Sequence, residues 1–167
     1  MRSILSVNEG KGTNLFFMVV YRVINPWYLT GFTDGEGCFA IIFSKHKTKT
    51  LGIDAHLCFE IELRLDEKPV LELFQKRLNC GRIIELRYDR YGWKPHVKYV
   101  VKKQHDIFYH VIPFFKKFPL QGKKKKDFLL FCKAAELIKK KRHLTKEGIM
   151  ELQKLREFMN DRRPLFG

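Results

Sequence analysis

Apolar and polar residues alternate along two stretches of the chain, and this pattern predicts two β-strands. In residues 38–46 the apolar positions Phe39, Ile41 and Phe43 share one face. In residues 56–65 one face carries only leucine, isoleucine and phenylalanine, and the other carries Cys58, Glu60, Glu62 and Arg64. The polar residues 45–55 between the strands predict a hairpin loop. The two strands are therefore expected to pair antiparallel, with one apolar face.

Helical spacing dominates most of the remaining chain. Residues 67–81 form an amphipathic pattern with Val70, Leu71, Phe74 and Leu78 on one stripe, and Gly81 is expected to end this helix. Residues 82–103 predict a second strand pair around a turn at 89–95. Three further helices are predicted, the first over 106–118 and ending at or near Pro113, then 125–143 and 145–160.

The first predicted helix spans residues 26–36. Asn25 is suited to the N-cap, Pro26 to the first turn, and Gly37 to the exit into the following strand. The order helix, strand pair, helix, strand pair, helices predicts an α+β fold, αββαββα. We expect a four-stranded antiparallel, saddle-like sheet with helices on one face and the other face open. Residues 1–24 form an expected N-terminal extension, and 25–167 a single domain.

Charge narrows the range of partners. Lysine and arginine exceed aspartate and glutamate by 33 to 18, a net charge of +15. This excess of positive charge favours a polyanionic binding partner. Nucleic acid is the first candidate, and an anionic membrane surface is the second. No membrane association is expected from the apolar run at 15–20, which is too short to cross a bilayer. The N-terminal extension is interpreted either as a presequence for import into an organelle or as a segment that results only from where the gene begins. The four cysteines have no zinc-site spacing and predict reduced packing residues.

An unusual end to the first helix points to a family. Residues 29–37, LTGFTDGEG, place two carboxylates where the helix dipole disfavours negative charge. This stretch resembles the nine-residue signature of LAGLIDADG homing endonucleases, of the single-motif, organellar intron-encoded type. Residues 58–83, 118–131 and 143–160 resemble later blocks of the same repeat. One copy of the motif implies a homodimer, with half of a longer two-repeat protein as the alternative.

The resemblance implies metal-dependent DNA cleavage. Glu36 holds the metal-binding position of the motif, and the carbonyl of Gly35 is a plausible second ligand. Asp34 either binds metal or closes the helix end. The cofactor expected is Mg²⁺ or Mn²⁺, because hard cations prefer oxygen ligands.

Other site residues follow from the same likeness. The family usually places a catalytic lysine shortly before an acid, which here favours Lys124 and next Lys123, within a run of four lysines that also suits a solvated helix start. Glu67 is expected to orient water, on a looser match. The dimer interface is expected at Leu29, Gly31, Phe32 and Gly35, with the glycines letting two motif helices pack closely. Expected DNA contacts from the open sheet face are Ser44, His46, Glu62, Arg64, Arg87, Arg90, Lys98 and Lys102.

The function implied is a site-specific DNA homing endonuclease. A homodimer would make a double-strand break in a long, roughly palindromic duplex. The alternatives are an RNA maturase acting on its host intron, and a catalytically silent DNA-binding protein on the same fold. A mitochondrial location is implied, with the chloroplast as the alternative.

Overall fold

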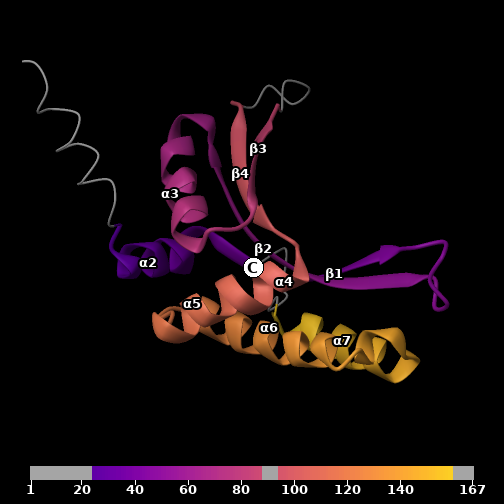
Figure 1. Cartoon of the computed structure of the whole chain (residues 1–167). Coiled ribbons are helices and arrows are strands. Elements are labelled where there is room, and N and C mark those ends of the chain that lie inside the picture. The colour runs from indigo at the N-terminus through magenta and orange to yellow at the C-terminus, as the bar shows by residue number, and fades with distance from the viewer. Residues whose placement is uncertain (1–23, 88–93, 160–167) are drawn as a thin grey trace, which may run out of the picture.

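The computed structural model describes residues 24–87 and 94–159 (Figure 1). The predicted extension, apart from residue 24, lies outside these ranges, as do Arg90 and most of the turn expected at 89–95. The elements in chain order are α2 (Pro26–Glu36), β1 (Gly37–Lys45), β2 (Ile53–Arg64), η1 (Leu65–Glu67), α3 (Lys68–Leu78), β3 (Arg82–Leu86), β4 (His96–Val101), α4 (Gln104–Asp106), η3 (Ile107–Val111), α5 (Ile112–Lys117), α6 (Lys124–Lys139), η4 (Arg142–Leu144) and α7 (Lys146–Met159).

The four strands form one antiparallel sheet in the order β1-β2-β4-β3. In this register Gly37 lies opposite Ile61, and Glu62 lies opposite Lys98. The sequence-based prediction of an α+β fold with two antiparallel strand pairs is confirmed. The inner position of β4 beside β2 brings side chains of the two hairpins next to each other.

One face of the sheet carries the hydrophobic core. Phe39 on β1 and Phe59 on β2 stack with ring centroids 5.0 Å apart, and Phe115, Phe128 and Phe131 from the helices pack around Phe39. Helix α6 packs on β1 and β2, and α3 on β3 and β4. Figure 1 shows α5, α6 and α7 gathered on one side of the strands. Burying these rings is the main stabilising contribution at this face, because each aromatic side chain removes a large apolar area from water.

Helix α2 is held at both ends by local chemistry. The side chain of Asn25 accepts a hydrogen bond from the backbone N–H of Trp27, as expected of an N-cap. At the other end Gly37 has an ordinary φ of −72°. A Cβ at Gly37 would lie 2.5 Å from Thr33 Cγ2, so close approach explains this glycine. The tip of α2 is therefore packed against the start of β1.

The prediction that a helix ends at or near Pro113 is wrong. Helical structure continues from Gln104 through Pro113 to Lys117, with a π-helical turn, η3, just before the proline. Proline has no N–H to donate and its ring crowds the carbonyl four residues earlier. The wider π turn relieves that conflict, and Pro113 then occupies the first turn of α5.

Within residues 24–87 and 94–159, no helix combines the length and apolar character that a membrane span requires. All four cysteines are free; Cys58 is buried, Cys80 and Cys132 are half-buried, and Cys38 is exposed rather than packed in the core.

Candidate active site and nucleic-acid interface

Three residues singled out in the sequence lie together at the end of α2. Glu36 is exposed on the last turn, beside the exposed Gly35, and that turn contains no basic residue of its own. The ammonium group of Lys124, from the start of α6, donates a hydrogen bond to the carbonyl oxygen of Gly35 at 3.3 Å. A positive charge from another element thus offsets the negative end of the helix.

The fold distinguishes Lys124 from its neighbours. Lys124 is half-buried, whereas Lys123, Lys125 and Lys126 are exposed. A groove of about 1290 Å³ runs along this lysine run and the start of β1, and its lining includes Gly37 and Cys38. Because residues 35 and 124 are far apart in sequence, only the packing of α6 beside α2 reveals which lysine reaches the helix tip.

Asp34 contacts the loop that precedes α6. Its Oδ2 accepts a hydrogen bond from the backbone N–H of Gln121 at 2.8 Å. Its Oδ1 is buried and has no hydrogen-bond partner among the residues that the structure describes, and a Cβ at Gly122 would lie 3.1 Å from it. Asp34 therefore joins α2 to the loop that leads into α6, whose first residue is Lys124. The roles of Gln121 and Gly122 were not foreseen, since nothing in their local sequence marks them.

The donor atoms at the tip of α2 fit a hard divalent cation. Glu36 offers a carboxylate and Gly35 a carbonyl, which are oxygen ligands of the kind that Mg²⁺ and Mn²⁺ prefer. A carbonyl oxygen has two lone pairs, so Gly35 can accept from Lys124 and still bind a cation.

Glu67 makes no polar contact with the group formed by Gly35, Glu36 and Lys124 among the described residues. It is exposed at the N-cap of α3 and its side chain does not cap that helix. Among the described residues, no hydrogen bond or ion pair joins Glu67 to Glu36 or Lys124. Its expected role in orienting water stays a prediction.

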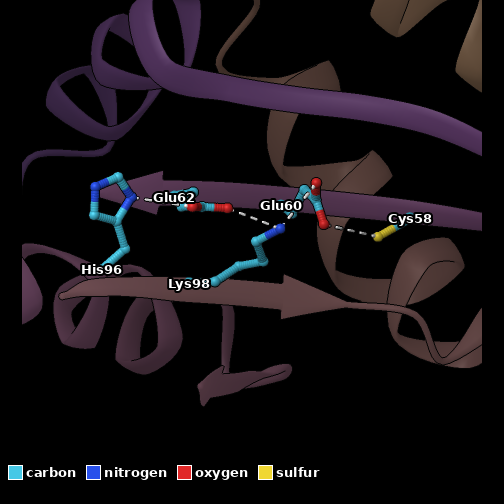
Figure 2. A network of polar contacts seen from close by, with 5 residues as sticks. All are labelled: Cys58, Glu60, Glu62, His96 and Lys98. Atoms are coloured by element: carbon cyan, nitrogen blue, oxygen red, sulfur yellow. Dashed lines mark hydrogen bonds and ion pairs between the residues drawn. The ribbon is translucent and has the colours of Figure 1, made fainter. Parts of the chain in front are cut away.

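A polar network crosses the open face of the sheet, between β2 and β4 (Figure 2). Lys98 Nζ lies 2.9 Å from Glu62 Oε2 and 3.5 Å from Glu60 Oε1. His96 Nδ1 lies 3.1 Å from Glu62 Oε1, and the Cys58 thiol lies 3.7 Å from Glu60 Oε2. The predicted DNA contacts Glu62 and Lys98 are therefore paired with each other. Glu60 and His96 belong to the same network, and only the register of β2 against β4 reveals it.

The contacts of this network shift the pKa values of nearby side chains. Partial burial would lower the pKa of Lys98, but its contacts with Glu62 and Glu60 outweigh burial and hold that pKa above its usual value. Burial, followed by the charge of Glu60, raises the pKa of the Cys58 thiol to about 12. Cys38 is exposed on this face by its overall surface, but partial desolvation of its sulfur, followed by the charge of Glu60, raises its pKa as well. Lys98 is therefore charged and both thiols are protonated at neutral pH.

The other predicted DNA contacts surround this network. Ser44 and His46 are exposed at the hairpin end of β1, and Arg64 forms an ion pair with Asp66. Arg87 and Lys102 are exposed beyond the ends of β3 and β4. Charged and polar groups thus extend from the hairpin tip across the open face.

The outer side of α2 presents an exposed stripe. Trp27 and Tyr28 are about half exposed. Gly31 and Gly35 are exposed, and a Cβ added at either position would meet no atom within 4 Å. Phe32 is half-buried against Phe74 at a ring-centroid distance of 5.8 Å. This stripe retains three of the four residues expected at a helix-pairing surface.

Leu29 is a correction to that prediction. Its side chain is 0% exposed and belongs to the hydrophobic core. It lies on the side of α2 that packs on β1 and β2, so it has no free surface for a second copy. The motif helix therefore uses its leucine to dock on its own domain.

Comparison with known proteins agrees with this geometry. The protein-family model for the LAGLIDADG endonuclease family matches residues 29–135 of this chain. A probable intron-encoded endonuclease 3 from Neurospora crassa is 34% identical over 137 residues, which are 82% of this chain and 25% of that protein. The chain thus spans about a quarter of the length of that relative.

Two solved structures share the fold. The homing endonuclease I-TnaI superposes with a TM-score of 0.75 at 29% identity, covering 82% of this chain and 88% of that one. The meganuclease I-SmaMI bound to uncleaveable DNA gives a TM-score of 0.76 at 28% identity, covering 93% of this chain and 54% of that one. Together with the family match over residues 29–135, these likenesses establish that the chain belongs to the LAGLIDADG endonuclease family.

Proposed function

We propose that this protein is a site-specific DNA homing endonuclease that makes a metal-dependent double-strand break in a long, roughly palindromic site. The observation that carries the proposal is the grouping of Glu36, Gly35 and Lys124 at an exposed helix tip. It lies at the foot of β1, whose open face continues into the polar network of β2 and β4. The net charge of +15 favours a polyanionic substrate.

Glu36 and the Gly35 carbonyl would hold Mg²⁺ or Mn²⁺, which when bound supplies Lewis-acid stabilisation and a more acidic water. Lys124 donates a hydrogen bond to the Gly35 carbonyl. We assign it the role of balancing negative charge that develops on the scissile phosphate, a contribution that preorganised cations make. Asp34 positions Lys124 by anchoring the loop before α6 through Gln121.

The open sheet face would contact the DNA. Glu60 and Glu62 repel phosphates, so in a complex they suit base edges rather than the backbone, and carboxylates can accept from cytosine N4. Lys98 between them can donate to guanine O6 and N7. The exposed residues Arg87 and Lys102 suit phosphate contacts.

Two copies of the chain would act together. The exposed stripe of Tyr28, Gly31 and Gly35 supports pairing of two α2 helices, because glycines allow close backbone approach. The similar length of I-TnaI, of which this chain covers 88%, is compatible with one repeat per chain. Pairing would bring two Glu36 groups near a two-fold axis, one for each DNA strand.

Related proteins indicate the genetic setting. Their names place them in introns, including intron 1 of ND4 in Podospora anserina and a Cox1 intron in Schizosaccharomyces pombe. Both genes support a mitochondrial location for this protein. Binding to host intron RNA would be a separate activity, which does not require Glu36.

The test is cleavage of DNA in which the two host-gene sequences flanking the reading frame are joined. Wild-type protein with Mg²⁺ should cut both strands, and EDTA should stop it. Glu36→Gln should bind the same DNA with unchanged affinity and leave it intact. The matched control is Glu157→Gln, which removes an exposed acid from α7 and should cut normally.

Equal cleavage by the Glu36→Gln protein would exclude the proposed site. Failure of the wild type to cut, combined with tight binding to intron RNA, would favour the maturase function.

A further inference from the structure

A group of potential metal ligands lies in the helical segment that follows β4. His105, Asp106 and His110 each offer one ligand atom, and these atoms all lie within 4.8 Å of one another. His105 Nδ1 is 3.5 Å from Asp106 Oδ1, and the imidazole centroids of His105 and His110 are 6.2 Å apart. We propose that these three residues form a binding site for a transition metal such as Zn²⁺, separate from the site at Glu36.

The π-helical turn creates this cluster. Positions five apart in an α-helix point about 140° away from each other, because each residue advances the helix by about 100°. His105 and His110 are five apart, and His110 lies within the π turn η3 (Ile107–Val111). Its additional residue per turn returns His110 to the face of His105 and Asp106. π turns are rare and often occur at functional sites.

The donor set distinguishes this site from the one at α2. Two imidazole nitrogens and one carboxylate oxygen suit Zn²⁺ and similar first-row metals, whereas Mg²⁺ prefers oxygen alone. Three protein ligands leave a fourth position for water. Ligands bound to one ion at about 2.0–2.1 Å are closer to one another than 4.8 Å, so the side chains must converge slightly. His105 is free to do so, because its side chain is 70% exposed.

The surroundings favour a fixed site over a chance encounter. Asp106 is only 18% exposed, so its carboxylate has few alternative positions. The Tyr109 ring lies against His105 at a centroid distance of 4.7 Å. An ion held by His105 and Asp106 before η3 and by His110 within it would keep the π turn in place. The inferred role is a structural clamp on the helix that packs beneath β2.

Calorimetric titration with Zn²⁺ alone tests the inference, in a Glu36→Gln background so that the α2 site lacks its acid. One equivalent should bind. His110→Gln should weaken this binding by more than about 10-fold, since even outer-sphere changes cost metal sites 10–100-fold. The matched control is His46→Ala, which removes an exposed histidine from the β1–β2 hairpin and should bind like the parent.

Three further measurements make the result decisive. Co²⁺ in place of Zn²⁺ should give visible absorption bands that His110→Gln lacks, and far-ultraviolet circular dichroism should show that this variant remains folded. Zn²⁺ should raise the thermal midpoint of the parent and leave that of His110→Gln unchanged. Equal Zn²⁺ affinity in the parent and a folded His110→Gln protein would overturn the inference. Neither outcome depends on DNA cleavage.

Discussion

Lys124 Nζ lies 3.3 Å from the carbonyl oxygen of Gly35 and donates a hydrogen bond to it. This contact joins the start of α6 to the negative end of α2, where the next residue is the exposed Glu36. It places one cation of a four-lysine run at the helix tip.

Replacing Lys124 by methionine is expected to slow cleavage by about 10²–10³, the usual cost of removing one preorganised charge-stabilising group. DNA affinity should change little, because the charge acts on the reacting phosphate. Single-turnover cleavage and a separate binding assay measure the two effects. Lys125→Met removes an exposed neighbour and should cut at nearly the parent rate. A similar loss in both variants would show that only the total charge matters.

Asp34 should prove to be structural. Asp34→Ala removes the acceptor for the Gln121 N–H, and we expect a loss of about 1.5–3 kcal/mol in the free energy of unfolding, as for hydrogen bonds to charged groups. Asp34→Asn keeps an acceptor oxygen and should lose less. Urea denaturation gives both values. Normal stability of Asp34→Ala together with abolished cleavage would instead indicate a metal ligand.

Gly31, within α2, and Gly37, directly after its last residue, should respond differently to substitution by alanine. A Cβ at Gly37 meets Thr33 Cγ2 at 2.5 Å, so Gly37→Ala should destabilise the monomer by about 1–3 kcal/mol. A Cβ at Gly31 meets nothing within 4 Å, and Gly31→Ala should raise helix stability by up to about 1 kcal/mol. Urea denaturation of the two variants measures both changes.

Gly31→Ala should nevertheless weaken the dimer, because the added methyl group separates the paired helices. Sedimentation equilibrium over a range of protein concentrations measures this effect. Gly52→Ala is the control, because Gly52 lies in the β1–β2 hairpin, away from α2. This variant should lose stability, since Gly52 has a positive φ of 65°, but its dimer should form as in the parent. An unaltered dimer in Gly31→Ala would place the interface elsewhere.

The ion pair of Glu62 and Lys98 should control discrimination between DNA sites. Glu62→Gln removes one negative charge and frees Lys98 for a phosphate. Non-specific DNA should then bind more tightly, and the slope of log affinity against log salt should steepen by about 0.9 for one added phosphate contact. Discrimination against altered base pairs should fall. Binding to specific and random duplexes over a salt series provides the measurement. An unchanged slope would mean that Lys98 stays bound to Glu60.

Sequence patterns predicted most elements of the fold because these patterns are local. The alternation in β1 and β2 and the stripe of α3 depend on neighbours a few residues away. The helix end predicted at Pro113 was wrong because a proline usually ends a helix, whereas here a π turn absorbs the conflict. Leu29 was placed at the dimer interface because the nine-residue motif does not reveal which side of its helix faces the sheet.

What the sequence by itself determined is the order of helices and strands, the basic charge and the motif that ends in Glu36 and Gly37. Only the tertiary structure decided that Lys124 reaches Gly35, that Asp34 holds Gln121, and that Glu62 is paired with Lys98. The physical reason is separation along the chain. Helical and strand periodicity act over a few residues, whereas these contacts join residues 36 or more positions apart and depend on how whole elements pack.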